Sequence, residues 1–479
     1  MKTKLNRRSF LKRAALTAGA VSAAKLYPGY LAASPSGPVG NKLNCVLIGC
    51  GGRGNAHLEA VIGKSGQNLY AIVDPDEKRH EAVRTWLKKR NLDPGKTQYF
   101  TDYRQMYDKI GRNLDAVFIA APNHHHALAA TIALQVGVNV YCEKPLCHNI
   151  AEARQLRQTA AEHPELVTQM GNQGHCEDGY RSLCEFIWAG VIGKVTETHS
   201  WTDRANGGIG PRPPTLPVPP GLNWDSWIGP APFRDYHSDL HPHEWHGWYD
   251  FGNGSIGNMG CHVLDGVFWA LKVGHPDSIE VEQKRGGTDE RYPTGCRLRW
   301  DVPARGDLPP LKAYWYEGLN EKTDASADGV LRAAKGDARN YPPLMVELSK
   351  QYPDENFESR DSGTLYVGEK GVIYTGTYGD RMHVVPYGKL SDSDRPPKTL
   401  PRPKDVFTDF ITAVLEGRKN TATPFEYGSR LTEFAILGNL AQHMGPGQKV
   451  EWDGHAMKVK NYHELNAWVT RKYRKGWKA

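Results

Sequence analysis

The sequence predicts an α/β protein in which an N-terminal doubly wound parallel sheet is followed by a second domain with antiparallel strands. Between residues 43 and 170, short apolar runs alternate with segments of helical periodicity. This alternation indicates a parallel sheet covered by helices on both faces. A glycine-rich turn directly follows the first apolar run. After residue 174 the alternation loosens, and period-two stretches at 296–302 and 311–316 are typical of antiparallel strands.

The elements of the first domain follow from this pattern in chain order. The predicted strands cover residues 43–48, 69–73, 115–120, 138–142 and 166–170. The predicted helices run from the glycine-rich turn to about residue 62, from about residue 76 onward, and over 124–136 and 150–162. Ligands of such sheets bind in the loops at the carboxyl ends of the strands, so we expect the functional site there.

The second half of the chain contains long loops rich in Pro, Gly and Trp. The loop at 207–230 has prolines at 211, 213, 214, 217, 219 and 220. A loop of this length within a compact domain is usually functional or forms a subunit arm. Helices near 405–416 and 429–443 are predicted to close the structure.

Residues 1–33 have the features of a twin-arginine export signal. Arg7 and Arg8 precede a Ser-Phe-Leu-Lys sequence and a short apolar run at 14–24. The run is too short to anchor the chain stably in a bilayer. The alternative, a basic N-terminal tail, leaves the apolar run unexplained. We therefore expect a protein that is exported after folding, to the periplasm or otherwise outside the cytoplasm, with its cofactor already inside.

The excess of positive charge in the chain lies entirely within the same segment. The whole chain has 60 Lys and Arg against 53 Asp and Glu, a net charge of +7. Residues 1–33 have seven basic and no acidic residues, so the remainder has 53 of each. This balance argues against a nucleic-acid partner. No later run is apolar enough to cross a membrane, and the eight cysteines have no CxxC pair, which favours buried core thiols over disulfides or a zinc site.

The glycine-rich turn predicts a site for the phosphates of a dinucleotide. Gly49 permits the tight turn, Gly51 lets the backbone approach a pyrophosphate, and Gly54 allows close helix–strand packing. Gly52 and Arg53 of the same turn are expected cofactor contacts, and the N-terminal amides of the helix that follows would face the phosphates.

An acid ends the second predicted strand. Asp74 lies 25 residues after Gly49, where a carboxylate accepts hydrogen bonds from an adenosine ribose and repels a 2′-phosphate. We therefore expect NAD rather than NADP as the cofactor. The alternative is that Asp74 caps the following helix, although Asp76 is the better-placed cap.

Five motifs in order resemble the glucose–fructose oxidoreductase, inositol dehydrogenase and rhizopine catabolism (Gfo/Idh/MocA) family. They are G-x-G-x-x-G with its acid, Pro122-Asn123-x-x-His126, Glu143-Lys144-Pro145, Gly254-x-x-x-Asn258-x-Gly260-x-His262-x-x-Asp265, and the stretch 363–371. The resemblance extends from Asn44 to about Asp453. It implies a Rossmann domain over 43–171, a substrate and oligomerisation domain with a large, mostly antiparallel sheet over 172–455, and a tail over 456–479. The open face of such a sheet often supports homo-oligomers.

The resemblance also implies roles for particular residues. Cofactor contacts are expected from two loops, which contain Ala121, Pro122, Asn123, His126, Glu143 and Lys144. Lys144 would lie beside the nicotinamide and stabilise alkoxide charge. His262 would lie across the cleft as the base that removes the hydroxyl proton, with a pKa suited to neutral pH. The alternatives are a surface lysine and a structural helix histidine.

The chain departs from the family at one catalytic position. Where the family most often has Asp, this chain has Asn258. An amide can orient the substrate or His262, but it cannot raise the basicity of an imidazole as a carboxylate would. His124 and His125 are expected to be helix N-terminal residues rather than ligands.

Substrate-facing candidates are less specific. Five tryptophans lie between residues 201 and 251, and their rings offer apolar faces to sugar C–H groups or form a packing cluster. Polar neighbours such as Arg204, His243 and Asp250 could bind hydroxyls. The substrate candidates are His175, Asp203, Trp245, His246 and Asp265, although a local cap or bridge is the favoured interpretation of Asp265. The sequence His241-Pro-His243-Glu-Trp-His246 lacks a helical HExxH and a fourth ligand, so no metal is predicted.

Three functions are compatible with these features. The first is an exported NAD(P)-dependent oxidoreductase that acts on a hydroxyl of a sugar, a glycoside or a cyclic polyol. The second is a glycosidase that works by transient oxidation, elimination and re-reduction, with the NAD recycled. The third is a non-catalytic sugar-binding protein, against which the intact Lys144 and His262 argue. In each case the partner is a small carbohydrate.

Overall fold

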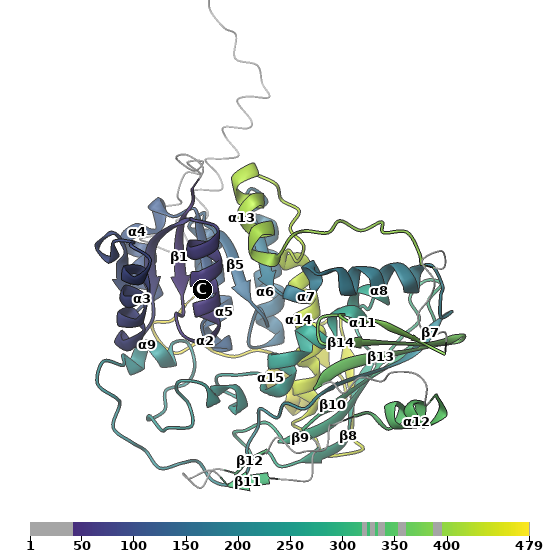
Figure 1. The fold of residues 1–479 in the computed structure, drawn as a ribbon. Helices are drawn as coiled ribbons and strands as arrows, with labels where there is room; N and C mark the ends of the chain where they lie inside the picture. The colour runs from purple at the N-terminus through teal and green to yellow at the C-terminus, as the bar shows by residue number, and fades with distance from the viewer. Residues whose placement is uncertain are drawn as a thin grey trace, which may run out of the picture.

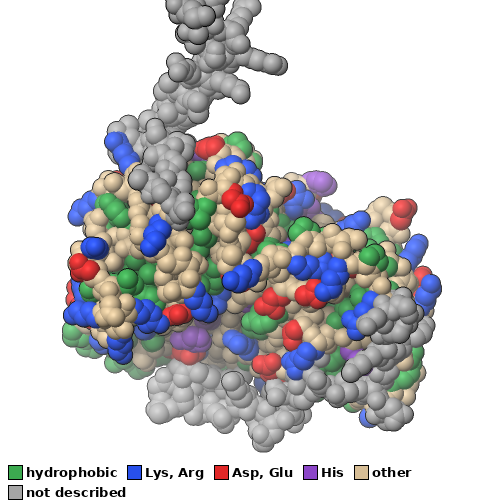
Figure 2. Space-filling model, turned by 45° about the horizontal axis from the view of Figure 1, so that its top comes forward, with side chains coloured by type: hydrophobic (Ala, Val, Ile, Leu, Met, Phe, Trp, Pro, Cys, Tyr) green, Lys and Arg blue, Asp and Glu red, His purple; other side chains and the backbone are tan. Residues whose placement is uncertain are grey.

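The computed structural model describes residues 42–318, 341–352, 361–386 and 395–478, with the backbone of 323–325 and 331–333. The predicted signal segment 1–33 lies outside these residues. Two sheets dominate the molecule (Figure 1). Basic and acidic side chains are interspersed over the face in Figure 2 rather than separated into patches of one sign. None of the helices in the described part of the chain is long and apolar enough to cross a membrane.

The first sheet has six parallel strands in the order β3-β2-β1-β4-β5-β6. They are β1 (Asn44–Ile48), β2 (Asn68–Val73), β3 (Gln98–Phe100), β4 (Ala116–Ile119), β5 (Asn139–Glu143) and β6 (Thr168–Gly171). The helices are α2 (Gly52–His57), continued by η1 (Leu58–Lys64), then α3 (Glu77–Lys89), α4 (Tyr103–Ile110), α5 (Asn123–Gln135) and α6 (Ile150–Glu162), with short turns η2 (Pro94–Lys96) and η3 (Gly111–Asn113). The predicted doubly wound parallel sheet is confirmed. The three-residue β3 and the helix that follows it, α4, were not predicted.

The second sheet has nine strands in the order β15-β14-β13-β7-β10-β9-β8-β16-β17. They are β7 (Val195–Thr202), β8 (Ser278–Arg285), β9 (Gly295–Val302), β10 (Leu311–Glu317), β13 (Ser362–Gly368), β14 (Gly371–Gly376), β15 (His383–Val385), β16 (Lys449–Asp453) and β17 (Lys458–Val459). Strands β7 and β10 pair in parallel, and the other neighbours pair antiparallel. The predicted mostly antiparallel sheet is therefore confirmed. A separate pair, β11 (Thr323–Ala325) and β12 (Leu331–Ala333), lies outside it.

The remaining helices connect and cover the sheets. They are α7 (Gln173–Cys176), α8 (Asp178–Trp188), α9 (Trp224–Ile228), η4 (Glu244–Gly247), η5 (Ile256–Gly260), α10 (Cys261–Val263), α11 (Asp265–Ala270), α12 (Pro343–Gln351), α13 (Val406–Glu416), α14 (Phe425–Ala441), η7 (His463–Leu465) and α15 (Asn466–Val469). The predicted helix at 405–416 is α13, with Asp405 as its N-cap. The predicted helix at 429–443 begins earlier, at Phe425.

Two late helices join the domains into one body. Helix α13 packs in one apolar cluster with β1, β2 and β4, beside the parallel sheet although it comes late in the chain (Figure 1). Helix α14 contacts α6 on one side and packs against Trp300 of β9 on the other. Gly438 makes that approach possible, because a Cβ there would lie 2.6 Å from the Trp300 ring. The two sheets thus share a continuous core.

Two segments of the second half reach back over the first domain. The first, residues 219–247, is called the roof segment below, and it bonds to the end of β2 through Asn223 N to Pro75 O at 2.8 Å. The second is the C-terminal strap, residues 471–478, which ends over the first domain in Figure 1. Arg474 of the strap contacts Asp225 and Gly229 of the roof segment. The long predicted loop therefore belongs to the site rather than to the periphery.

Candidate functional site

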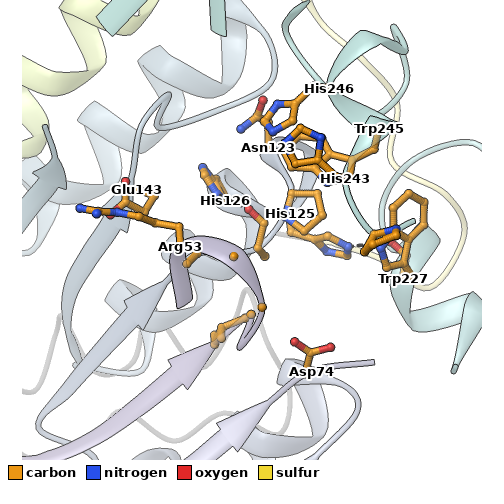
Figure 3. Close-up of a pocket in the computed structure, with 18 of the residues that line it drawn as sticks. Arg53, Asp74, Asn123, His125, His126, Glu143, Trp227, His243, Trp245 and His246 are labelled. Atoms are coloured by element: carbon orange, nitrogen blue, oxygen red, sulfur yellow. Dashed lines mark hydrogen bonds and ion pairs between the residues drawn. The ribbon is translucent and has the colours of Figure 1, made fainter. Parts of the chain in front are cut away.

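A cleft of about 480 Å³ opens at the carboxyl ends of β1 and β4, where the strand order reverses. Such a switch point is where ligands bind in open α/β sheets. The loops of the parallel sheet form its floor, and the roof segment faces them with Trp227, His243, Trp245 and His246 (Figure 3). Trp477 of the C-terminal strap completes the lining.

The glycine-rich turn is shaped to admit a ligand. Gly49 has φ +84°, and a Cβ there would lie 2.7 Å from the backbone of Ala120. A Cβ on Gly54 would lie 2.0 Å from the carbonyl oxygen of Gly49, so only glycine lets α2 pack this closely. Gly51 and Gly52 line the cleft, and the space around a Cβ of Gly52 is open. The turn thus has the form that the phosphates of a dinucleotide require.

Asp74 lies at one end of the cleft, away from Arg53 and Glu143 (Figure 3). Its carboxylate accepts from the backbone N of Cys50 at 2.7 Å and of Asp76 at 3.0 Å. Burial raises the pKa of Asp74, against the effect of these amides and of the Arg79 charge. Asp76, not Asp74, caps α3 by accepting from Lys78 N at 3.0 Å. Asp74 thus fixes the glycine-rich turn and lines the end of the cleft where the sequence analysis expects the adenosine ribose, which is called the ribose end below.

The loop after β4 supplies the second wall. Ala121, Pro122 and Asn123 line the cleft, and Asn123 Oδ1 is buried with no hydrogen-bond partner among the described residues. An unpartnered buried acceptor in a cleft wall fits a ligand that donates to it. The ring nitrogens of His126 lie 2.7 and 2.6 Å from the carbonyl oxygens of Pro145 and Ala121, which ties this loop to the one after β5.

His124 and His125 hold the roof segment rather than a ligand. Their Nε2 atoms lie 3.0 and 2.8 Å from the carbonyl oxygen of Trp227. Burial lowers the pKa of both rings, which agrees with neutral imidazoles that donate to a carbonyl. The prediction that they are helix N-terminal residues agrees with their place in the first turn of α5.

Glu143 is buried in an ion pair. Arg53 Nε donates to Glu143 Oε1 at 2.8 Å, and His57 Nε2 lies 2.9 Å from the same oxygen. Burial alone would raise the pKa of Glu143, but the hydrogen bond from His57 and the charge of Arg53 outweigh it and hold the pKa at about 2. Glu143 therefore anchors Arg53 at the start of α2, beside the phosphate turn.

Lys144 extends from the end of β5 toward the second domain. Its Nζ donates to the backbone oxygen of Asn258 at 2.5 Å. Burial lowers the pKa of Lys144 to about 8, with Arg204 and Arg53 acting in the same direction and Glu143 against it. The pKa of Lys144 thus lies close to neutral pH, a property common among catalytic lysines.

His262 lines the cleft from α10 with only 4% of its surface exposed. Its Nδ1 lies 2.9 Å from Asn172 Oδ1, whose amide nitrogen donates to Cys261 O at 2.8 Å. Because Asn172 Oδ1 accepts, His262 Nδ1 carries the proton and Nε2 keeps a free lone pair. Burial, together with the charge of Lys144, lowers the pKa of His262 well below its ordinary value. The expected pKa near neutrality is therefore corrected: His262 is neutral but a weaker base than free imidazole.

Asn258 does not orient His262. Its side-chain Nδ2 donates to Asn206 Oδ1 at 2.8 Å, and its backbone oxygen holds Lys144. Asn172, which sequence reasoning did not assign a role, takes the position of the orienting group.

The substrate candidates divide into two groups. Trp245 and His246 line the cleft and stack on each other with ring centroids 3.6 Å apart. His175 and Asp265 are instead paired with each other at 2.9 Å and buried, with the His175 ring stacked on Trp269. Neither lines the cleft, so the substrate contact expected of His175 is corrected to a structural one, whereas Asp265 forms the kind of local bridge that was its favoured interpretation.

Asp203 requires the same correction. It is absent from the cleft lining, and its backbone N donates to Asp361 O at 2.7 Å, between the end of β7 and the start of β13. The next residue, Arg204, lines the cleft instead, as does Tyr378, whose ring edge faces His262 at 5.1 Å. Neither Tyr378 nor Trp477 was a sequence candidate, because no motif marks the loops that contain them. Among the described residues, no group of three or more His, Cys, Asp or Glu is arranged to hold a metal ion.

The match to family models decides the classification. Residues 43–170 match the NAD-binding Rossmann fold of an oxidoreductase family, and residues 195–291 match the C-terminal alpha/beta domain of the same family. The chain belongs to the Gfo/Idh/MocA oxidoreductase family. The cleft described above lies between these two Gfo/Idh/MocA domains, with Lys144 on the first and His262 on the second.

Curated Gfo/Idh/MocA relatives are distant. A glycosyl hydrolase family 109 protein of Shewanella pealeana is 30% identical over 205 residues, which cover 40% of this chain and 44% of that protein. An inositol 2-dehydrogenase of Salmonella typhimurium is 28% identical over 159 residues, or 33% of this chain and 45% of that protein. The chain thus spans less than half the length of the curated relatives it matches.

A solved structure with the same fold is the WlbA dehydrogenase from Bordetella pertussis in complex with NADH and UDP-GlcNAcA. It aligns with a TM-score of 0.55 at 14% identity and covers 86% of this chain and 99% of that one. At this identity the likeness shows the Gfo/Idh/MocA fold alone.

Proposed function

We propose that the protein is an exported oxidoreductase that removes hydride from a hydroxyl-bearing carbon of a sugar, a glycoside or a cyclic polyol. The observation that carries the proposal is the placement of Lys144 and a neutral, oriented His262 on opposite domains of one cleft. The fold neighbours and relatives named above include dehydrogenases, which supports the reaction class.

The residues of the cleft divide the chemistry between them. When bound, the nicotinamide supplies the hydride acceptor. His262 takes the hydroxyl proton on Nε2, because Asn172 keeps the proton of Nδ1 in place. The Lys144 ammonium stabilises the negative charge that develops on the same oxygen. The Asn258 carbonyl positions that ammonium.

For the cofactor we propose NAD rather than NADP, retained through repeated turnovers. The hydride taken from one sugar hydroxyl would then be passed from the bound cofactor to the carbonyl of a second sugar, which restores NAD without a free nucleotide pool. The Asp74 carboxylate supports NAD because it would repel a 2′-phosphate. The roof segment and Trp477 support retention, since they cover the cleft from the side opposite the glycine-rich turn. An enzyme that works outside the cytoplasm has no free nucleotide pool, so retention and export support each other.

A glycosidase is the second candidate. Transient oxidation, elimination of the aglycone, hydration and re-reduction would leave the retained NAD unchanged, which suits a covered cofactor. The similarity to a glycosyl hydrolase family 109 protein favours it. We further propose a homo-oligomer built through the open face of the nine-stranded sheet, which light scattering of the purified protein would test.

One experiment separates these functions. The purified protein is denatured in acid, the released nucleotide is identified, and native protein is screened against glycosides for both keto product and free sugar. Keto product alone supports the oxidoreductase, and free sugar without net NADH supports the glycosidase. Release of no nicotinamide nucleotide, together with weak binding of added NAD, would contradict both. His262→Ala should slow turnover by about 10²–10⁴-fold, the usual cost of losing a general base.

A further inference from the structure

The reaction end of the cleft has an excess of positive charge. Lys144 and Arg204 both line it, and Arg204 makes no ion pair with any residue the structure describes. The family most often has an acid at position 258, where this chain has an amide. The histidines of the same wall, His246 and His262, are neutral because burial lowers the pKa of each.

The carboxylates that line the cleft all interact with protein groups other than Arg204. Glu143 is paired with Arg53 and His57, and Asp102 is paired with Arg104. Asp74 lies at the ribose end and accepts from two backbone amides. No carboxylate on the described cleft wall is therefore placed to neutralise Arg204.

Arg204 is mounted on a backbone that is fixed relative to the catalytic residues. Its own N donates to Thr202 Oγ1 at 3.2 Å, at the end of β7. Two residues later, Asn206 N donates to Ser255 Oγ at 2.7 Å, and Asn206 Oδ1 accepts from Asn258 Nδ2 at 2.8 Å. The turn that carries Arg204 is thus bonded to Asn258, whose carbonyl holds Lys144.

The side chain of Arg204 is exposed, whereas its turn is anchored. Its charge reaches the catalytic groups, because it lowers the pKa of both Lys144 and His262. A guanidinium presents a planar fork of donors that matches the two oxygens of a carboxylate or phosphate. An anion bound there would remove the charge excess that the protein itself leaves uncompensated.

We propose that Arg204 is a specificity-determining residue that binds an oxyanion on the substrate, so that the preferred substrate is an acidic carbohydrate. The oxyanion is the carboxylate of a sugar acid or the phosphate of a sugar phosphate, since both fit the same fork. The prediction that acidic sugars are turned over rests on the proposed oxidoreductase function. The prediction that Arg204 binds an oxyanion does not depend on that function. Neutral sugars would lack the contact and bind more weakly.

The test compares the holoprotein with Arg204→Gln and Arg204→Lys. Binding is measured by calorimetry for D-glucuronate, D-gluconate, D-glucose 6-phosphate and neutral D-glucose, and turnover is measured for each. Arg212→Gln is the matched control, because Arg212 pairs with Glu290 outside the cleft lining. Loss of a hydrogen bond to a charged group predicts about 10- to 100-fold weaker binding of the acidic ligands to Arg204→Gln.

The expected result is that this loss is confined to the acidic ligands, with partial recovery in Arg204→Lys. Comparison of the two acids with the sugar phosphate identifies the source of the oxyanion. Preference of the parent for the neutral sugar, or equal losses for acidic and neutral ligands, would overturn the inference. Binding of acidic ligands without turnover of any sugar would overturn the proposed function instead, and leave the anion site standing.

Discussion

Lys144 and His262 line the same cleft, but the pKa values of their side chains differ in where they lie relative to neutral pH. The pKa of Lys144 is lowered to about 8, whereas that of His262 is lowered well below its ordinary value. Above pH 8 the lysine loses the charge that stabilises an alkoxide, while His262 stays neutral throughout the neutral range. The pH dependence of the proposed oxidation should therefore be set by the lysine.

We predict that kcat is flat from pH 6 to 7.5 and falls above pH 8. Lys144→Arg should be slower but should lose this alkaline limb, because a guanidinium stays protonated at every accessible pH. Lys64→Arg, at an exposed position on η1, serves as the control and should keep the parent profile. The measurement is a pH–rate profile with saturating substrate. An alkaline limb that persists in Lys144→Arg would assign the titration to another group.

A second prediction at the residue scale concerns the choice between NAD and NADP, for which Asp74 and Arg79 are the relevant residues. Arg79 lines the cleft five residues after Asp74 and lies against Gly51. Asp74→Ala should weaken NAD binding by about 10- to 100-fold through the lost charged acceptor. It should also strengthen NADP binding, because an arginine near the ribose accommodates a 2′-phosphate.

The double variant Asp74→Ala with Arg79→Ala is the control for that result. It should lose the gain for NADP without recovering NAD. Titration of nucleotide-free protein with each cofactor gives the affinities. Unchanged NAD affinity in Asp74→Ala would show that the carboxylate serves only the Cys50 and Asp76 amides.

Among the elements, the C-terminal strap has the largest predicted effect on the cofactor. The Trp477 ring is 3% exposed, with the Arg104 guanidinium 3.5 Å from its centroid and Tyr103 edge-on at 5.7 Å. Arg104 also donates to Gly476 O at 2.7 Å. These contacts hold the strap across the ribose end of the cleft, on α4.

We predict that Trp477→Ala releases bound nucleotide about tenfold faster than the parent, since cation–π and aromatic contacts of this kind contribute about 1 kcal/mol or more. Trp468→Ala is the matched control, because that ring lies on the preceding helix, is 44% exposed and is outside the cofactor cleft. Release is followed by the fluorescence of retained NADH after dilution into excess NAD. Equal release rates for the two variants would remove the strap from cofactor retention.

Local sequence accounts for the floor of the site, and long-range contacts account for its cover. Gly49, Gly54 and Asp76 act within a few residues or within one βαβ unit, so their roles follow from spacing. The bond of Asn172 to His262 joins residues 90 apart in the chain, and that of Arg104 to Gly476 joins residues 372 apart. No pattern within one segment encodes such pairs.

Misplaced candidates have the same cause. Asp265 has the family spacing to His262, but it begins a separate helix, α11, and its carboxylate contacts His175 and accepts from Tyr427. Asp203 and Arg204 are adjacent in the turn that follows β7, and only Arg204 lines the cleft. Sequence reasoning named both residues of this loop, and the structure places only Arg204 in the cleft lining.

For the whole molecule, the testable feature is export of a folded, loaded protein. All eight cysteines are buried and unpaired, so the described fold does not depend on an oxidising compartment. We predict that Arg7→Lys with Arg8→Lys retains the protein in the cytoplasm, folded and with nucleotide bound, because the receptor reads the arginine pair. Arg13→Lys, outside the pair, is the control. Cell fractionation followed by nucleotide release from each fraction measures the effect, and undiminished export of the double variant would refute the signal assignment.

The packing of α13 and the strap also fixes an order of events during synthesis. All strands of the parallel sheet are present once residue 171 has left the ribosome. One apolar face of that sheet stays uncovered until Val406, Phe410 and Ile411 of α13 have been synthesised. The cleft is covered later still, because Trp477 of the C-terminal strap follows α13 in the chain. A stalled or truncated chain therefore lacks the cover of the nucleotide cleft, even though it contains the whole glycine-rich turn. Under the export proposed above, retained nucleotide would mark a chain whose cleft is already covered by the strap before transport begins.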